Sequence, residues 1–283
     1  MEVGYLGPDN TTFGYMATEQ YFGRRRIETI AFPTHAAICQ AVGAEEVTLG
    51  VVATENVVDG IVNETVYGVE DVFRKFGVRV IGETELPIEL FYLKKNNDGT
   101  RPDKVLSHAK GIGQCRQFIG KLRQEGIVVE VRNSTGEAAK EASSNPQFAA
   151  IASARAEKVY GLARISEDSV VDNKNSFTRF WVLGKQMPQP TGQDKTCLLI
   201  NLEQPIPGGL AKSLVFFAER GVNLLVVYPI PIKGRKWEYT FFLEFNGHLF
   251  DQPMREAYEA LEQSGICLGG PLVLGSYPAA ARP

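Results

Sequence analysis

The sequence lacks the features that usually identify metal, redox and nucleotide sites. Its four cysteines are widely spaced and form no C-x-x-C pair, although spacing alone does not exclude disulfides. The three histidines, His35, His108 and His248, are too scattered for a metal cluster. The glycines form neither a G-x-G-x-x-G pattern nor a phosphate loop. We therefore expect no bound metal, no cofactor and no nucleotide.

The sequence also lacks a strong charge of one sign and a long apolar run. Its net charge of -3 at pH 7 gives no reason to expect a nucleic-acid partner or an anionic membrane surface. No uninterrupted apolar stretch approaches the roughly 20 residues that a membrane span needs. The opening residues 1–6 do not resemble a charged-then-apolar leader. These absences predict a cytoplasmic protein that does not bind membranes.

What the sequence does contain, over residues 1–185, is an alternation of short apolar runs with longer helical patterns. This alternation predicts an α/β fold of mainly parallel sheets with helices on both faces. The expected strands are 3–6, 47–53, 78–81, 104–107, 127–131, 149–152 and 179–183. The clearest helical patterns between them are 111–124, 136–143 and 153–160.

A polar stretch at 185–195, with two prolines and a glycine, is typical of a linker. After it the pattern of strands and helices starts again, with a hairpin turn expected at Lys233-Gly234-Arg235. The expected order is strand 196–202, helix 208–220, strand 224–232, strand 237–245, helix 253–263 and strand 268–275. This βαββαβ order is that of a ferredoxin-like fold. We therefore predict two domains, 1–185 and 195–279.

Small polar residues follow several of the predicted strands, at 7–12, 54–56, 107–108 and 133–137. In open parallel sheets, ligands bind beyond the carboxyl ends of the strands. Helix N-termini at these ends present free N–H groups and a partial positive charge, which suits a small ligand with carboxylates. A single hydroxyl more often caps its own helix, and Ser134 has capping-box spacing from Glu137. Only the recurrence of such residues at successive strand ends favours a site.

The segment 172–181 is more specific, because it brings a hydroxyl and a guanidinium to the start of an apolar strand. Arg179 can bind a carboxylate through two hydrogen bonds, which a lysine cannot do. The neighbouring Thr178 can donate a hydrogen bond or a proton to a leaving hydroxyl. Taken alone, a Thr-Arg pair at a strand start is more often structural than catalytic.

Together these segments resemble the prephenate dehydratase family, in the same order from about residue 3 to residue 278. The most specific match is Asn175-Ser176-Phe177-Thr178-Arg179-Phe180, which resembles the family's Thr-Arg-Phe signature. The other matching stretches are Gly7-Pro8-Asp9-Asn10-Thr11, Glu55-Asn56 with Gly60, Ser107-His108 with Gln114-Cys115, Ser134-Thr135, Ala150-Ile151-Ala152-Ser153, Trp237-Glu238-Tyr239 and Leu274-Gly275-Ser276-Tyr277-Pro278.

The resemblance implies a catalytic domain of two α/β lobes around a cleft, like periplasmic binding proteins, followed by an ACT-type regulatory domain. It implies conversion of prephenate to phenylpyruvate, with loss of water and carbon dioxide, by a homodimer or homotetramer that senses phenylalanine. The expected catalytic residues are Thr178, Arg179 and Glu55, with Arg179 on a substrate carboxylate and Thr178 toward the leaving C4 hydroxyl. The expected substrate-binding residues are Thr11, Asn56, Ser107, Gln114, Ser134, Thr135 and Phe180.

Several residues depart from the family pattern around the expected site. Phe13 and Val57 replace polar residues, and Ala53-Thr54 stands where the family has Pro-Ile. Ala109-Lys110 replaces the Pro-Gln that follows Ser-His. These changes predict a pocket that is less polar than is usual in the family.

A larger departure lies in the expected effector site of the ACT domain. The family's Glu-Ser-Arg-Pro motif falls on Tyr228-Pro229-Ile230-Pro231, and its Gly-Ala-Leu motif is Gly208-Gly209-Leu210. An amino-acid effector needs polar partners for its ammonium and carboxylate. Tyr228 and Ile230 cannot pair these groups as ions, so the sequence predicts weak or absent phenylalanine feedback.

Three other functions remain open at this point. A prephenate decarboxylase on the same scaffold would keep the C4 hydroxyl, although the Thr178-Arg179-Phe180 signature argues against it. An arogenate dehydratase would need a partner for the substrate ammonium, and the sequence reveals none. A small-molecule sensor without catalytic activity is the rival of another class, since cleft and ACT folds also occur as binding modules.

Overall fold

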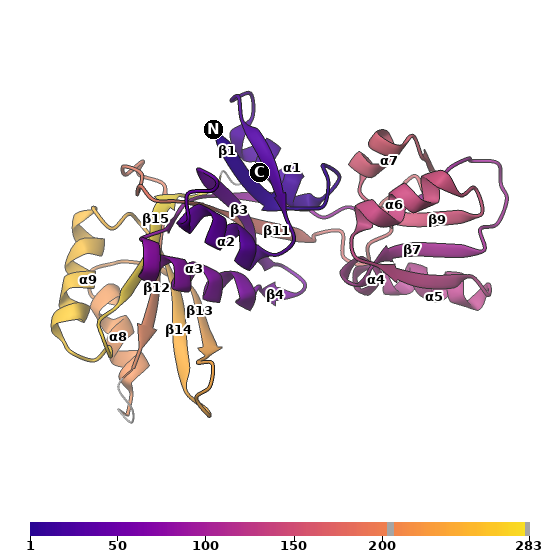
Figure 1. Ribbon diagram of the computed structural model, residues 1–283. Coiled ribbons are helices and arrows are strands. Elements are labelled where there is room, and N and C mark those ends of the chain that lie inside the picture. Colours follow the sequence, from indigo (N-terminus) through magenta and orange to yellow (C-terminus); the bar gives the residue numbers. More distant parts are fainter. Residues whose placement is uncertain (203–206, 281–283) are drawn as a thin grey trace. The chain divides into compact units, whose positions relative to one another are not determined.

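The computed structural model describes residues 1–202 and 207–280 and divides into two compact units. Unit 1 contains residues 1–38, 51–62 and 85–180, and unit 2 contains residues 39–50, 63–84 and 181–283. Strands β3 (Leu49–Asn56), β5 (Arg79–Pro87) and β11 (Phe177–Gly184) therefore have residues in both units. Figure 1 labels β3 and β11. The units do not follow the predicted domain limits, which remain a prediction.

The remaining elements alternate along the chain as the apolar pattern predicts. The other strands are β1 (Glu2–Leu6), β2 (Glu28–Phe32), β4 (Gly60–Ile61), β6 (Phe91–Lys94), β7 (Lys104–His108), β8 (Val128–Arg132), β9 (Phe148–Ala152), β10 (Ala163–Arg164), β12 (Asp194–Asn201), β13 (Leu224–Pro231), β14 (Tyr239–Asn246) and β15 (Leu272–Pro278). The helices are α1 (Phe13–Phe22), α2 (His35–Gly43), α3 (Asn63–Phe76), α4 (Ala109–Gln114), α5 (Arg116–Gln124), α6 (Thr135–Ser144), α7 (Ala154–Tyr160), α8 (Gly209–Ala218) and α9 (Gln252–Gln263).

The first lobe of unit 1 is built on strands β1 and β2, which are parallel and in register over all five residues of each strand. Strand β3 continues this sheet on the other side of β1. Helix α1 lies close to β1, because a Cβ atom at Gly14 would stand 3.1 Å from the carbonyl oxygen of Leu6. A glycine at this position therefore allows the helix to start directly against the end of the strand.

The second lobe of unit 1 is a sheet in the order β10-β6-β9-β7-β8, with parallel pairing among β9, β7 and β8. Successive residues of a strand point to opposite faces. Accordingly, Ala149 and Ile151 pack with Ile119 and Leu122 of α5, whereas Ala150 belongs to the cluster beneath α6 and α7. This lobe thus buries both faces of its sheet, and Figure 1 shows α4 and α5 on one side and α6 and α7 on the other.

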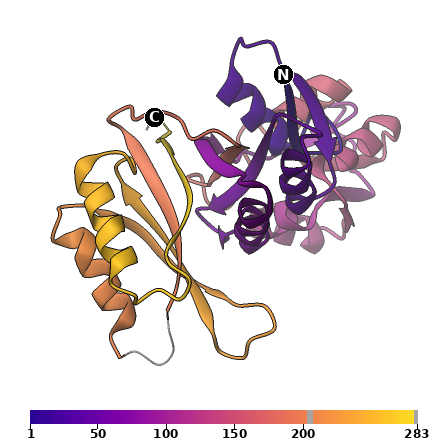
Figure 2. The same cartoon turned by 60° about the vertical axis from the view of Figure 1, so that its left-hand side comes forward.

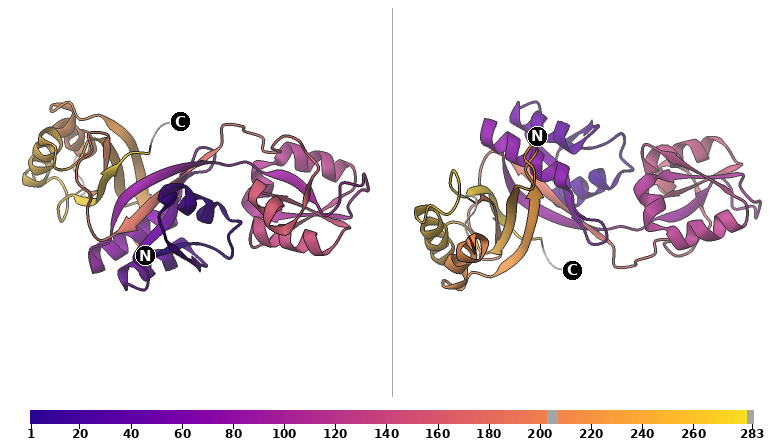
Figure 3. Two further views of the ribbon diagram at one scale, coloured as in Figure 1. Left: turned by 90° about the horizontal axis from the view of Figure 1, so that it is seen from above. Right: turned by 90° about the horizontal axis from the view of Figure 1, so that it is seen from below.

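Two chain segments, 85–90 and 170–177, lead into and out of this second lobe, and both views of Figure 3 show them. A backbone hydrogen bond from the Ile88 N–H to the Ser176 carbonyl, 2.8 Å long, holds the two segments together. A further bond joins the Val170 N–H to the Leu90 carbonyl at 2.7 Å. Two hydrogen-bonded segments therefore connect this lobe to the rest of the chain, and the second of them leads into β11, which bears the Thr-Arg pair.

The C-terminal part of unit 2 has the order β12-α8-β13-β14-α9-β15 and the sheet order β13-β14-β12-β15. This is the predicted ferredoxin-like fold, and Figure 2 shows both helices on one face of the sheet. The core beneath them includes Phe217 of α8 and Phe245 of β14, whose rings stack at 4.0 Å between centroids. The turn at 233–235 joins β13 to β14, and Gly234 has the positive φ of 78° that such a turn favours.

Three details of the predicted elements were wrong. The expected helix 111–124 is divided at Cys115, whose φ of -121° and ψ of 35° leave the helical range. Trp237 is not in a strand, because its φ is +63° and β14 begins only at Tyr239. Strands β2, β4, β6 and β10 were missed, since β2 is half exposed and the other three are too short for a periodic pattern.

All four cysteines are free thiols with buried side chains, so the structure forms no disulfide from them. Among the residues that the structure describes, no helix has both the length and the apolar character needed to cross a membrane.

Candidate functional site

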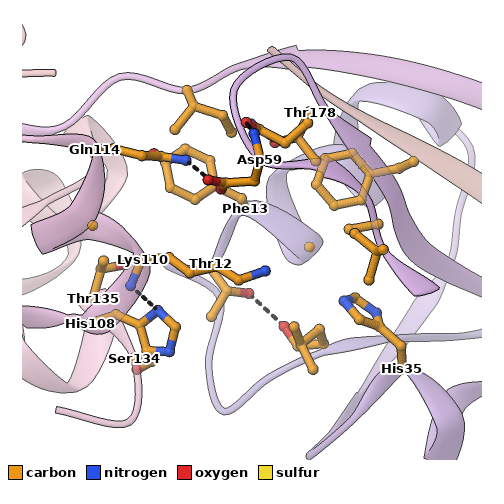
Figure 4. Close-up of a pocket in the computed structure, with 18 of the residues that line it drawn as sticks. Thr12, Phe13, His35, Asp59, His108, Lys110, Gln114, Ser134, Thr135 and Thr178 are labelled. Atoms are coloured by element: carbon orange, nitrogen blue, oxygen red, sulfur yellow. Dashed lines mark hydrogen bonds between the residues drawn. The ribbon is translucent and has the colours of Figure 1, made fainter. Parts of the chain in front are cut away.

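A pocket of about 250 Å³ lies within unit 1 and is lined by both lobes (Figure 4). Six of the residues predicted from the sequence line it, namely Asn56, Gln114, Ser134, Thr135, Thr178 and Phe180. The polar residues that also line it are Thr12, His35, Asp59, His108, Lys110 and Asn133. The structure thus brings residues that are widely separated along the chain to one cavity.

Helix N-termini surround this pocket, as the strand-end pattern suggested. Thr12 caps α1 by accepting the Tyr15 N–H at 3.3 Å. Ser134 caps α6 by accepting the Glu137 N–H at 2.9 Å, and His108 caps α4 through Nδ1. Each cap binds one of the free N–H groups at the start of its helix. The remaining free N–H groups and the helix dipole still favour negative charge nearby. The pocket is therefore suited to an anionic ligand.

The predicted capping box at α6 is present in a modified form. Ser134 binds the Glu137 N–H, but the Glu137 carboxylate turns back to the N–H of Asn133 at 3.0 Å rather than to that of Ser134. Both hydrogen bonds keep the 133–135 segment against the pocket. The hydroxyl of Ser134 therefore serves the helix as an acceptor and keeps its hydrogen for another partner.

The hydroxyl of Thr178 is held in place by the side chain of Asn56. The Asn56 Nδ2 donates to the Thr178 Oγ1 at 2.9 Å and to the Phe177 carbonyl at 3.1 Å. The Asn56 Oδ1 accepts the N–H groups of Val58 and Asp59, at 2.8 and 3.1 Å. Because Thr178 Oγ1 accepts a hydrogen bond here, its own hydrogen is available for a ligand in the pocket.

Arg179 does not line this pocket, although its neighbours Thr178 and Phe180 do. Adjacent residues of a strand point to opposite faces, so the side chain of Arg179 turns away from that of Thr178. Its Nη2 lies 2.6 Å from the Glu55 Oε2, and the Arg179 side chain is only 9% exposed. Arg179 and Glu55, both expected to be catalytic, therefore form an ion pair with each other and do not line this pocket.

Thr11 and Ser107 are also absent from the pocket lining, since both are fully buried. The Ser107 Oγ donates to the Ile151 carbonyl at 2.8 Å, and the Thr11 Oγ1 donates to the Asp9 carboxylate at 2.5 Å. Gly136 lets α6 approach this loop, because a Cβ there would lie 2.2 Å from the Thr11 Oγ1. These hydroxyls hold the strand ends in place rather than facing a ligand in this pocket.

Asp9 connects the first loop to the second lobe. It accepts hydrogen bonds from Thr11 and from the Tyr160 hydroxyl, the latter at 2.7 Å. Burial raises the pKa of Asp9, but these hydrogen bonds outweigh burial and lower it overall. Burial and the Asp9 carboxylate together raise the pKa of Tyr160 to about 12, so the tyrosine stays a donor at neutral pH.

The pocket contains chemical groups that the sequence analysis did not select. His108 lines the pocket, and burial and, secondly, the charge of Lys110 lower its pKa. Its Nδ1 accepts the Lys110 N–H at 3.3 Å, which leaves Nε2–H as the donor of a neutral ring. Asp59 and Lys110 add a carboxylate and an ammonium. Their position after a strand end was the only signal that could have indicated them.

The departures from the family pattern have mixed effects on the pocket. Phe13 lines it and makes it less polar, whereas Val57 is exposed and does not line it. Lys110 acts in the opposite direction, because it adds a full positive charge to the lining. The expectation of a less polar pocket therefore holds at Phe13 but not at Lys110.

The degenerate effector motifs lie in the ferredoxin-like part of unit 2. Gly208 has a φ of +74° and precedes α8, where Gly209 is buried and Leu210 packs against the core. The segment Tyr228–Pro231 forms the end of β13, and the side chain of Ile230 is buried. The buried Ile230 therefore offers no charged group at the position of the family's effector motif, and the loss of effector binding remains a prediction.

Comparisons with known proteins agree with this fold and identify the family. The family model described as prephenate dehydratase matches residues 3–188. The bifunctional chorismate mutase/prephenate dehydratase of Aquifex aeolicus is 33% identical over 99% of this chain and 74% of its own length. The prephenate dehydratase of Bacillus subtilis is 30% identical over 98% of each chain. A solved prephenate dehydratase from Arthrobacter aurescens, in complex with L-Phe, is 25% identical with a TM-score of 0.80 over 98% of this chain and 90% of that chain. The chain belongs to the prephenate dehydratase family.

Proposed function

We propose that this chain converts prephenate to phenylpyruvate, water and carbon dioxide in the pocket of unit 1. The observation that carries the proposal is the Thr178 hydroxyl, which faces the pocket and is oriented by Asn56 at 2.9 Å. The surrounding helix N-termini and Lys110 suit a substrate that carries two carboxylates. No residue of the pocket needs to form a covalent bond with the substrate.

The reaction needs little more from the protein than to orient prephenate and to stabilise the hydroxide that leaves C4. The C1 carboxylate leaves as carbon dioxide, its bonding electrons enter the ring, and the C4–O bond breaks. The oxygen leaves as hydroxide and takes up one proton to become water, while the ring becomes aromatic. Thr178 donates a hydrogen bond to the departing oxygen, and the proton comes from solvent through that contact. Phe180 and Phe13 supply an apolar wall for the ring.

Incubation with prephenate tests this proposal, because phenylpyruvate absorbs strongly in alkali and a dihydro product does not. We expect phenylpyruvate and carbon dioxide in equal amounts. Carbon dioxide without phenylpyruvate would identify a non-aromatising decarboxylase. Binding of prephenate without turnover would identify a sensor.

Arogenate is a second candidate substrate, favoured by the carboxylate of Asp59 in the pocket lining. This carboxylate is a partner for an ammonium that the sequence did not reveal. Its Oδ2 already accepts a hydrogen bond from the Gln114 Nε2 at 3.2 Å, and Lys110 lines the same pocket. These two contacts favour prephenate, so we expect a higher kcat/KM for prephenate than for arogenate when both are assayed together.

We expect phenylalanine to bind this chain weakly or not at all, because Ile230 and Tyr228 cannot pair a carboxylate and an ammonium as ions. Calorimetric titration with phenylalanine measures this directly. Tyrosine serves as the control ligand for nonspecific binding of an aromatic amino acid. Binding at micromolar phenylalanine, with inhibition of turnover, would contradict the prediction.

A further inference from the structure

A second cavity, with a volume of about 390 Å³, adjoins the pocket within unit 1. The two share Asp59, Lys110 and Gln114 in their linings. The hydrogen bond from Gln114 to Asp59, which is drawn in Figure 4, joins two of these shared residues. The remaining residues that line the second cavity are Val58, Gly113, Arg116, Val171, Asp172, Asn173 and Ser176.

The charged groups of this second cavity are not paired with one another. The Asp172 carboxylate accepts the backbone N–H groups of Arg116 and Gln117, at 2.8 and 3.1 Å, and so caps α5. The Arg116 Nε donates to the Gly113 carbonyl at 3.0 Å. Within residues 1–202 and 207–280, no ion pair joins Lys110 or Arg116 to a carboxylate. Both side chains are exposed, so either can pair with an anionic ligand without breaking an existing ion pair.

Ser176 adds a hydroxyl that is buried but has no partner. Its residue is 2% exposed, and its Oγ makes no hydrogen bond within the described part of the chain. Its backbone carbonyl is already bound to the Ile88 N–H at 2.8 Å, so the segment is fixed where it lies. A buried hydroxyl without a partner is unfavourable, and native proteins usually satisfy such groups. A ligand oxygen in this cavity would supply the missing partner.

We propose that this second cavity binds the carboxylate of the substrate's pyruvyl side chain, with Lys110 as its ion-pair partner and Ser176 as its hydroxyl donor. The inference deepens the proposed function and rests on it. Arg116 adds to the positive electrostatic potential of the cavity and does not need to contact the carboxylate directly. Lys110 is central because it lines both cavities and can meet a substrate held in the first.

The choice between the two substrate carboxylates follows from the reaction. The ring carboxylate must give its bonding electrons to the ring, so a strong ion pair to it would stabilise the ground state more than the transition state. The pyruvyl carboxylate keeps its charge throughout, and binding it does not oppose the chemistry. Lys110 and Ser176 can therefore bind the pyruvyl carboxylate, which remains in the product, without slowing the reaction.

Steady-state kinetics of Lys110→Gln and Ser176→Ala test the inference. Loss of a charge-assisted hydrogen bond raises KM for prephenate by roughly ten- to a hundredfold, and loss of the hydroxyl raises it by about fivefold. In both variants kcat should stay within about threefold, because the contact is the same in ground and transition states. The control is Lys121→Gln, which removes the same charge from an exposed position on α5 of the same lobe and should leave KM unchanged.

Thermal unfolding separates binding from a structural role for Ser176. The Oγ has no hydrogen bond to lose, so Ser176→Ala should leave Tm unchanged or raise it while KM rises. A lower Tm with an unchanged KM would show that Ser176 is structural and would overturn its part in the proposal.

Titration with phenylpyruvate makes the test independent of turnover, because this product keeps the pyruvyl carboxylate and lacks the ring carboxylate. We expect Lys110→Gln to weaken its affinity by about the same factor as it raises KM. Wild-type values in both Lys110→Gln and Ser176→Ala, for KM and for phenylpyruvate, would overturn the inference and leave the proposed function intact. A wild-type protein that binds phenylpyruvate through Lys110 but converts no prephenate would overturn the proposed function alone.

Discussion

Replacing Thr178 with alanine should lower kcat for prephenate dehydration by about a hundredfold or more, the usual effect of removing one acid or oxyanion contact. The Thr178 hydroxyl faces the pocket, and Asn56 occupies its acceptor side at 2.9 Å. The hydrogen is thus directed to the departing C4 oxygen. Stopped assays of phenylpyruvate formation at saturating prephenate measure the effect on kcat.

Two further variants at this position separate the hydroxyl from the shape of the side chain. Thr178→Ser keeps the hydroxyl and should retain most of the activity. Thr178→Val has nearly the same volume without a hydroxyl and should be as inactive as Thr178→Ala. An active Thr178→Val variant would show that the hydroxyl has no part in the chemistry.

The second large effect is expected for Asn56→Asp. This substitution keeps the shape of the side chain but replaces the amide nitrogen, a hydrogen-bond donor, with a carboxylate oxygen, which only accepts. The Asn56 amide nitrogen donates to the Thr178 Oγ1 and to the Phe177 carbonyl, whereas a carboxylate oxygen can only accept. The Thr178 hydroxyl would then donate to the new carboxylate and could not donate to the substrate. We expect kcat to fall by about as much as in Thr178→Ala, again roughly a hundredfold.

Acid should partly restore the Asn56→Asp variant, because a protonated carboxyl regains one donor. The N–H groups of Val58 and Asp59 bind the other oxygen and favour the ionised form, so recovery should begin only near or below about pH 4, the ordinary range of an aspartic acid. The measurement is the ratio of variant to wild-type kcat between pH 7 and the lowest pH at which both stay folded. Asn145→Asp, whose Oδ1 keeps its bond to the Gln147 N–H, is the matched control and should behave as wild type. A near-normal kcat for Asn56→Asp at pH 7 would show that the Asn56 donor is dispensable.

Much of the fold was predictable because it depends on local patterns. Alternating apolar runs and helical stretches indicated most strands of both lobes, and the order after residue 195 indicated the ferredoxin-like part. Short or half-exposed elements such as β2 and β6 gave no such signal. The break at Cys115 was also invisible, because the α5 cap comes from Asp172, which is distant in sequence.

Much of the pocket was indicated by motifs that follow strand ends, and Asn56, Gln114 and Thr178 do line it. Lys110 and Asp59 were not indicated, because a charged residue after a strand is usually solvated. Ser107 shows the opposite error, since its hydroxyl donates to the Ile151 carbonyl of a neighbouring strand. Which polar groups are already used within the protein depends on partners that the local sequence does not identify.

The sequence by itself determined that Thr178 and Arg179 begin an apolar strand and that their side chains point to opposite faces of it. Only the tertiary structure decided which face is the pocket. Asn56 reaches Thr178 from one side, and Glu55 binds Arg179 at 2.6 Å, although both belong to a strand more than 120 residues earlier. A strand's two faces are equivalent until other segments pack on them, so the direction of the guanidinium could not be read from the Thr-Arg pair alone.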